Sequence, residues 1–306
     1  MRLRLLSAAG LAVAAAVALA GCGGSAKPRP DLIFVSTKSG VYDLYEMNAD
    51  GSDQRRLTTG STRSATQTQE LAYARDPSWS RDGRRIAFDG THDAPSAIFV
   101  MDADGKNAHQ ISISPNGDRQ PTWSPDGKRI AFIRGKAGAL YVESSTGSGA
   151  RRLTFTTAAE SDPAWSPDGR WIAFVRLTLN TPTRELWLIH PDGTGARELT
   201  ALGASVGGPA WSPDSRRIAF SSDVSTGTFA IFAVSVKGGK APRVSSPSVA
   251  DAVSPSWSPD GKRIAFSRDG AIVVATLGGG EKTVTNPKDN DSTPVWNPIP
   301  APAKAK

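Results

Sequence analysis

Hydrophobic and polar residues alternate in one short pattern that recurs along this chain. Its clearest copy runs from Pro121 to Phe132 and reads Pro-Thr-Trp-Ser-Pro-Asp-Gly-Lys-Arg-Ile-Ala-Phe. Successive copies begin 39 to 46 residues apart, a period typical of the blades of a β-propeller. A tryptophan opens each copy, and the last copy is degenerate: Trp79, Trp123, Trp165, Trp211, Trp257 and Trp296.

Each full copy predicts a β-hairpin. The segment Ser-Pro-Asp-Gly is a tight-turn sequence, because proline presets φ at the second position and glycine accepts a positive φ. After the turn, the large residues Ile130 and Phe132 share one face of a strand. An isoleucine follows the tryptophan at the same spacing in all five full copies: Ile86, Ile130, Ile172, Ile218 and Ile264. This fixed register indicates one rigid hairpin that is built five times.

Two further strands complete each repeat. The third strand is predicted from Ile98, with counterparts that begin at Leu44, Leu140, Leu186, Ile231 and Ile272. The fourth is short and ends in an aliphatic and a hydroxyl residue: Leu57-Thr58, Ile111-Ser112, Leu153-Thr154, Leu199-Thr200, Val244-Ser245 and Val284-Thr285. Four antiparallel strands per repeat and six repeats predict an all-β, six-bladed β-propeller.

The two ends of the repeat region predict how the ring closes. Residues 31–59 hold second, third and fourth strands but no Trp-Ser strand, whereas residues 292–298 hold Pro294-Val295-Trp296 alone. Together they make one complete blade, with three strands from the N-terminal side and the innermost from the C-terminal side. Pairing these two segments removes sheet edges that would otherwise invite aggregation.

The first residues form a targeting segment rather than part of the fold. Arg2 and Arg4 precede an apolar run, and Leu19-Ala20-Gly21-Cys22 ends in the sole cysteine of the chain. This resembles the lipobox of bacterial lipoproteins, which implies a signal peptide over residues 1–21 and a lipid on Cys22. The alternatives are an uncleaved membrane anchor and an ordinary secretory signal with a chance cysteine. Residues 22–30 are expected to be a linker and residues 299–306 a disordered tail.

The repeat Pro-x-Trp-Ser-Pro-Asp-Gly-x-x-Ile-Ala-Phe, with a later Asp-Gly turn and Leu-Thr, resembles the TolB-type propeller repeat over residues 31–298. Three turns depart from it: Ser80-Arg81-Asp82-Gly83 lacks the proline, Ser212-Pro213-Asp214-Ser215 lacks the glycine, and Trp296-Asn297-Pro298 lacks Asp-Gly. We expect no α/β domain before the repeats, which is a further departure from TolB proper. The resemblance implies a propeller at the cell envelope, in a fold that serves partner binding, peptidase gating and sugar-lyase chemistry.

The charge of the chain adds little to this picture. The chain has 36 basic and 29 acidic residues, and without Arg2 and Arg4 its net charge is 34 − 29 = +5. This positive charge could favour binding to anionic lipids or cell-wall polymers. Many positive residues, however, fall at the repeat turns, where we interpret them as solvated strand starts: Arg84, Arg85, Lys128, Arg129, Arg216, Arg217, Lys262 and Arg263. Nucleic-acid binding is not expected.

Strand order divides the loops between two faces of the propeller. The first-to-second and third-to-fourth turns are short and alike, and we call their side the uniform face. The blade-to-blade connections and second-to-third loops differ between blades, and this variable face is where binding is expected. Residues before the inner-strand prolines should ring the channel there: Asp76, Gln120, Asp162, Gly208, Ser254 and Thr293. Nearby loop carboxylates are Asp118, Glu160, Asp251, Asp289 and Asp291.

This mixed acidic ring could bind a divalent cation or a basic segment of a partner, or it could be a solvated channel mouth. We expect no metal and no cofactor. Asp102 to Asn107 lacks the glutamate and flanking helices of a calcium loop. Gly203-x-Ser-x-Gly207 lies in a loop rather than at the strand-to-helix elbow of a hydrolase. The three histidines, His92, His109 and His190, share no metal-ligand spacing, and no catalytic residue is predicted.

Three functions remain. The first is a non-enzymatic, lipid-anchored envelope protein, expected to be a monomer, whose propeller binds another envelope protein through Asp76, Asp118, Gln120, Glu160, Asp162, Asp251, Asp291 and Thr293. The second is a binding or sensing module for a small ligand or a cell-wall glycan, although the variable loops carry few aromatic residues. The third is an envelope hydrolase or lyase that would depend on His92.

Overall fold

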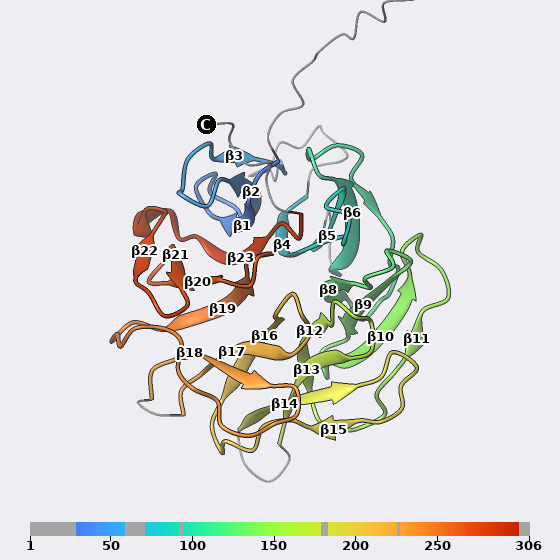
Figure 1. Ribbon diagram of the computed structural model, residues 1–306. Coiled ribbons are helices and arrows are strands. Elements are labelled where there is room, and N and C mark those ends of the chain that lie inside the picture. The colour runs from blue at the N-terminus through green and yellow to red at the C-terminus, as the bar shows by residue number, and fades with distance from the viewer. Residues whose placement is uncertain (1–28, 59–70, 92–94, 179–182, 225–226, 300–306) are drawn as a thin grey trace, which may run out of the picture.

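The computed structural model describes residues 29–58, 71–91, 95–178, 183–224 and 227–299. Six antiparallel sheets surround a central axis, as Figure 1 shows, and the short helix η1 (Pro287–Asp289) is the one helical element of the described residues. The predicted six-bladed propeller is confirmed. The signal segment, Cys22, most of the linker and tail, and His92 lie outside the described residues.

The first three blades in chain order have four strands each. Blade 1 consists of β23 (Ser292–Trp296), β1 (Leu32–Ser36), β2 (Asp43–Met47) and β3 (Arg55–Arg56). Blade 2 consists of β4 (Tyr73–Trp79), β5 (Arg85–Thr91), β6 (Ala97–Asp102) and β7 (His109–Gln110). Blade 3 consists of β8 (Asp118–Trp123), β9 (Arg129–Arg134), β10 (Ala139–Ser144) and β11 (Arg151–Arg152).

The other three blades repeat this order, with one shortened sheet. Blade 4 consists of β12 (Glu160–Trp165), β13 (Ile172–Leu177), β14 (Arg184–Ile189) and β15 (Arg197–Glu198). Blade 5 consists of β16 (Val206–Trp211), β17 (Arg217–Ser222) and β18 (Ala230–Ser235), and its fourth strand is reduced to a bridge between Phe232 and Arg243. Blade 6 consists of β19 (Ala252–Trp257), β20 (Arg263–Arg268), β21 (Ala271–Thr276) and β22 (Glu281–Thr283).

The ring closes as the sequence predicts. The C-terminal strand β23 pairs antiparallel with β1, placing Leu32 opposite Trp296 and Ile33 opposite Val295. Asn297 extends this contact, since its backbone N–H donates to the carbonyl of Asp31 at 2.8 Å. In Figure 1 the red strand β23 therefore lies beside the blue strand β1. Blade 1 thus contains strands from both ends of the described chain.

The Ile-Ala-Phe residues of the second strand, which are Leu32-Ile33-Phe34 in blade 1, form the core of every blade. The phenylalanine is fully buried in all six: Phe34, Phe88, Phe132, Phe174, Phe220 and Phe266. In blade 2 it lies opposite Phe99 on the third strand, with ring centroids 5.6 Å apart. Such cross-strand aromatic pairs stabilise a sheet beyond their buried area, which explains the aromatic column of the third strand.

The hydroxyl residue at the end of each repeat ties the fourth strand to the third. Thr58 Oγ1 accepts the backbone N–H of Leu44 at 2.9 Å, and Ser112 Oγ accepts that of Ile98 at 2.9 Å. The same bond recurs in the other four blades. A buried N–H that would otherwise lack a partner is satisfied by this side chain, which gives the Leu-Thr pairs their physical reason.

The interpretation of the turn arginines as solvated strand starts is wrong for half of them. Arg85 and Arg129 lie over the indole rings of Trp123 and Trp165 of the next blade, at 4.5 and 4.9 Å from the ring centroid. Arg217 and Arg263 do the same to the next tryptophans in the ring. Blade 4 has Trp171 at this position, stacked on His190 at 3.9 Å. These cations therefore join neighbouring blades, and the tryptophans are buried packing residues as expected.

Glu143 is an exception in the packing between blades. It lies opposite Ile130, at a position where the other blades have Met47, Met101, Ile189, Val234 and Ala275. Its carboxyl is buried, and Oε1 has no hydrogen-bond partner among the described residues. Burial, with a smaller contribution from the charge of Asp118, raises the pKa of Glu143 to about 7.

We expect Glu143→Leu to stabilise the propeller at neutral and alkaline pH. The folded-state pKa is raised, so the wild-type protein loses stability as pH rises from the unfolded-state value through about 7. The loss is on the order of 3 kcal/mol above pH 7, because a tenfold difference in proton affinity between the folded and unfolded states corresponds to about 1.4 kcal/mol. Urea denaturation at pH 5 and pH 8 measures this loss of stability. The exposed Glu198→Leu is the control, and an unchanged pH dependence in Glu143→Leu would contradict the assignment.

Candidate functional site

A ring of six residues with left-handed backbone surrounds the central channel. Each lies in an inner strand directly before a proline: Asp76 (φ 47°), Gln120 (56°), Asp162 (51°), Gly208 (57°), Ser254 (55°) and Thr293 (44°). The pairing register shifts at this point in every blade. This conformation is costly for residues other than glycine, above all for the β-branched Thr293. The residues predicted from the sequence as a ring are therefore brought together.

Side chains of the ring bind backbone groups of the next blade. Gln120 donates its backbone N–H to Asp89 Oδ1 at 3.0 Å, and Asp162 donates its own to Gln120 Oε1 at 3.1 Å. Gly208 in turn donates its N–H to the carboxylate of Asp162. The amide of Gln120 also donates to Asp162 Oδ1 at 2.5 Å. A continuous hydrogen-bonded belt thus runs from blade 2 to blade 5.

The ring encloses a cavity of about 370 Å³, which we call the central cavity. One side is polar and includes Asp76, Gln120, Asp162 and Arg184. The other side, formed by blades 5, 6 and 1, is mainly apolar, with Val206, Phe229, Val253, Val295, Pro209, Pro255 and Pro294, while Ser221, Ser254 and Thr293 add hydroxyl groups. The cavity is therefore asymmetric, although the scaffold that forms it repeats six times.

Two carboxyl groups of blade 2 share a hydrogen bond beside the cavity. Asp76 and Asp89 contact through their side chains, which requires one of them to be protonated. Burial, followed by the charge of Asp162, raises the pKa of Asp76 to about 6. Burial and the charge of Asp76 raise the pKa of Asp89 well above its usual value. Of the two carboxyl groups, Asp89 is therefore the one that holds the shared proton more strongly.

The sequence interpretation missed Asp89. In the other blades the residue after the core phenylalanine is Val35, Ile133, Val175, Ser221 or Ser267. A carboxylate occurs in this column in blade 2 alone, so comparing the columns for departures from the repeat could have found it. The predicted site covered residues before the prolines and in the loops, whereas Asp89 lies inside the second strand, β5.

Asp118 and Glu160 lie at the starts of their inner strands, outside the lining of the central cavity. Asp118 forms two hydrogen bonds to Arg134, at 2.7 and 2.8 Å, and Glu160 accepts one from Arg176 at 2.8 Å. Both carboxylates are fully buried. Each partner is the arginine at the end of the second strand of the same blade. These two residues anchor the variable end of blades 3 and 4.

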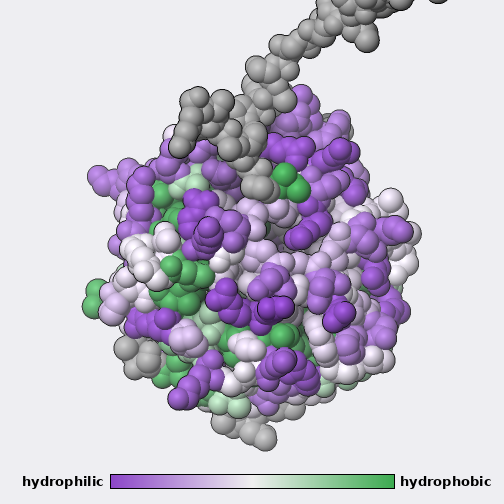
Figure 2. Space-filling view, in the orientation of Figure 1, coloured by the Kyte–Doolittle hydropathy of each residue, from purple (hydrophilic) through white to green (hydrophobic). Residues whose placement is uncertain are grey.

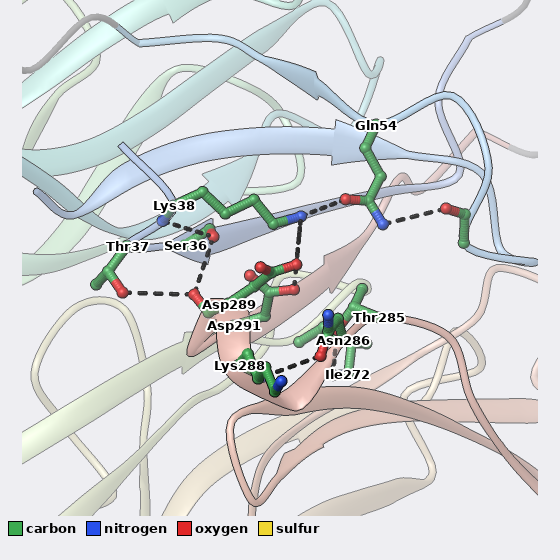
Figure 3. Close-up of polar contacts among 11 residues, drawn as sticks. Ser36, Thr37, Lys38, Gln54, Ile272, Thr285, Asn286, Lys288, Asp289 and Asp291 are labelled. Atoms are coloured by element: carbon green, nitrogen blue, oxygen red, sulfur yellow. Dashed lines mark hydrogen bonds and ion pairs between the residues drawn. The ribbon is translucent and has the colours of Figure 1, made fainter. Parts of the chain in front are cut away.

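Asp251 and Asp291 also lie outside the cavity lining. Asp251 Oδ1 accepts the backbone N–H of Phe229 at 2.8 Å. Figure 3 shows Asp291 beside Asp289 and facing the amino group of Lys38, which lies 3.1 Å from Asp289 Oδ2 and 4.0 Å from Asp291 Oδ2. This cluster joins the loop after β1 to the segment that leads into β23. It therefore supports ring closure on the variable face.

Exposed apolar side chains gather on loops of the variable face. Within the described ranges, the exposed large hydrophobic residues are Ile113, Phe155, Val224 and Val249, which are 88, 80, 39 and 99 % exposed. The first, second and fourth belong to blade-to-blade connections, and Val224 follows β17 in a second-to-third loop. Figure 2 shows apolar patches among polar residues, with a broad one over the region where β19 lies in Figure 1.

Other candidate motifs do not assemble into a site. His109 is exposed at β7, and His190 is stacked on Trp171, two blades away. Ser205 of the Gly-x-Ser-x-Gly sequence lies in the loop before β16, an inner propeller strand. Among the described residues, no group of three or more His, Cys, Asp and Glu side chains is arranged to hold a metal ion. In the same part of the chain, no helix has the length and hydrophobicity needed to cross a membrane.

The sequence matches the TolB beta propeller domain over residues 62–181 and 157–300, which together span most of the chain. The protein belongs to this family. The search of curated proteins found no match to the sequence.

Solved structures share the fold at low sequence identity. TolB from Acinetobacter baumannii superimposes with a TM-score of 0.73 and 19% identity, over 88% of this chain and 67% of that one. A provisionally named TolB from Agrobacterium tumefaciens gives a TM-score of 0.64 and 18% identity, over 90% and 100% of the two chains. Hydrazine synthase from Kuenenia stuttgartiensis gives 0.70 and 16%, over 89% and 47%. The fold of this chain is thus shared by proteins of different kinds.

The two sets of carboxylates in this TolB-type propeller should respond differently to substitution. Asp118→Ala leaves Arg134 without its ion pair, so we expect the free energy of unfolding to fall by about 3 kcal/mol. Burial already disfavours the ionised form of Asp162, whose pKa is raised, so Asp162→Asn should change stability by less than about 1 kcal/mol. Chemical denaturation at pH 7 measures both. Equal losses would show that the central ring serves stability alone.

Proposed function

We propose that this protein is a non-enzymatic component of the bacterial cell envelope whose propeller binds another protein through the variable face. The observation that carries the proposal is the placement of the exposed apolar residues. Ile113, Phe155, Val224 and Val249 all lie on loops of one face, which is also the face where the central cavity opens. Exposed apolar groups collected on one surface and separated by polar residues are typical of protein interaction sites.

The envelope location rests on the N-terminal sequence and on the family. Leu19-Ala20-Gly21-Cys22 follows an apolar segment and offers a lipidation site on Cys22. The TolB named among the structural neighbours is a protein of a bacterium, Acinetobacter baumannii. A lipid anchor on Cys22 would hold the propeller close to a membrane, with residues 23–30 as the connection.

The second candidate is a module that binds a small ligand or a cell-wall glycan. The observation that favours it is the central cavity, whose volume of about 370 Å³ falls within the range of ligand pockets, ~300–1,000 Å³. The weaker alternative of a hydrolase or lyase would depend on His92, which lies outside the described residues.

Crosslinking in intact cells followed by affinity capture tests the binding proposal. We expect the triple variant Ile113→Ser, Phe155→Ser, Val249→Ser to capture at least tenfold less of a crosslinked partner than the wild-type protein does. The matched control changes three exposed residues of uniform-face turns, Lys106→Ser, Arg170→Ser and Lys262→Ser, and should retain the partner. A partner kept by the first variant and lost by the second would contradict the choice of face. A protein that crosslinks to no partner would contradict the function itself.

Intact-mass spectrometry of the membrane fraction tests the anchor. We expect the mature protein to begin at Cys22 and to carry a diacylglycerol group, because the lipobox directs cleavage before the modified cysteine. Cys22→Ser should abolish the added mass and move the protein out of the membrane fraction. A protein of unmodified mass that retains residues 1–21 would instead support an uncleaved anchor.

A further inference from the structure

The central cavity has two walls of opposite character. From this contrast we propose that it receives one cationic side chain, the ammonium of a lysine or the guanidinium of an arginine, presented by the bound partner. The inference rests on the proposed protein-binding function and names the chemistry of the residue at its centre. It is carried by the cavity and by its polar and apolar walls.

The polar wall presents carboxylates that are held in place by other groups. Asp162 accepts hydrogen bonds from the Gln120 amide at 2.5 Å and from Ser161 Oγ at 3.0 Å, so both of its oxygens are oriented. Each carboxylate oxygen can accept a further hydrogen bond. Asp76 lines the same cavity and is held by Asp89 behind it. A cation placed here would meet two oriented carboxylates without any rearrangement of the ring.

The apolar wall suits a methylene chain. Val206, Val253, Val295 and Phe229 line it together with Pro209, Pro255 and Pro294. Lysine and arginine side chains carry an apolar stem below the charged group and bury that stem against apolar surface. A bare metal ion would use the carboxylates and leave this wall without a contact. The combination therefore favours an organic cation over an inorganic one.

Three arginines lie near these carboxylates, and two of them are engaged elsewhere. The Arg75 guanidinium stacks on Tyr42, 3.6 Å from the ring centroid, and Arg119 donates to the carbonyl of Gly135 at 2.8 Å. Arg184 lines the cavity and is exposed. It can donate to backbone carbonyls of the segment that presents the cation. The charges thus fit a peptide that carries both a basic side chain and hydrogen-bond acceptors.

Isothermal titration with matched amino-acid probes tests the inference. The purified protein is titrated with N-acetyl-lysine methylamide, with the arginine analogue, and with N-acetyl-norleucine methylamide, which has a similar stem and no charge. We expect a cationic probe to bind at least tenfold more tightly than the norleucine probe. The two cationic probes show whether ammonium or guanidinium is preferred. Equal binding of all three probes, or of none, would overturn the inference.

Variants locate the site. Asp162→Asn and Asp76→Asn should each lower the affinity for the cationic probe about tenfold and leave the affinity for the norleucine probe unchanged. Asp104→Asn removes the same charge from an exposed turn on the uniform face and should have no effect. Calcium chloride is titrated in parallel. Calcium binding that the two ring variants abolish, together with no binding of the cationic probes, would assign the cavity to an inorganic ion and overturn the inference.

Affinity for the cationic probe should rise from pH 5 to pH 7.5 in the wild-type protein. Asp76 has a pKa of about 6 and faces Asp89 from β5, Arg119 from β8, Asp162 from β12, and Arg75 and Tyr73 on its own strand. Above that pH its carboxylate is charged. Asp76→Asn should remove most of this dependence. If the captured partner depends on Ile113, Phe155 and Val249 but not on Asp162, the proposed function stands and the cationic inference fails.

Discussion

The pairing of β23 with β1 is the contact on which the rest of the structure depends. It joins residues from opposite ends of the described chain and completes blade 1. Without it, β1 would present a free edge, and the central cavity would lose Thr293, Pro294 and Val295 from its lining. The cluster of Lys38, Asp289 and Asp291 supports the same closure from the variable face. The central cavity therefore has its complete lining only when the ring is closed.

Repeated residues build the scaffold, and departures from the repeat carry the individual character of this protein. The buried phenylalanines, the strand-end hydroxyls and the arginine–tryptophan stacks recur because each blade packs on the next in the same way. Asp89 and Glu143 break the pattern at buried positions. Asp89 lies beside the cavity and is hydrogen-bonded to Asp76 and to the backbone N–H of Gln120, whereas Glu143 lies between blades with an unpaired oxygen. The first fits a functional role, and the second costs stability with no compensating contact that the structure shows.

Buried carboxylates divide into two classes by their partners. Asp118 and Glu160 are neutralised by arginines of their own blade, which compensates the cost of removing them from water. Asp76, Asp89 and Asp162 are held by amides, backbone N–H groups and each other, so burial raises their pKa values. Of these three, Asp76 and Asp162 line the central cavity. The same residue type therefore serves the fold in one place and, in another, lines the cavity for which we propose binding.

The sequence by itself determined the propeller, its six blades and its closure, because each depends on local signals. Tight turns, strand alternation and a constant spacing after each tryptophan can all be recognised in short stretches of sequence. It also placed Asp76, Gln120, Asp162 and Thr293 on one ring, since the residue before each proline occupies the same site in every blade. Only the tertiary structure separated them from Asp118, Glu160, Asp251 and Asp291. Those four differ in which side chain of a neighbouring strand or loop they meet, and such contacts depend on the packing of segments that the sequence pattern leaves unspecified. For the same reason the partnership of Asp76 with Asp89, and of each turn arginine with the tryptophan of the next blade, emerged only when the strands were assembled.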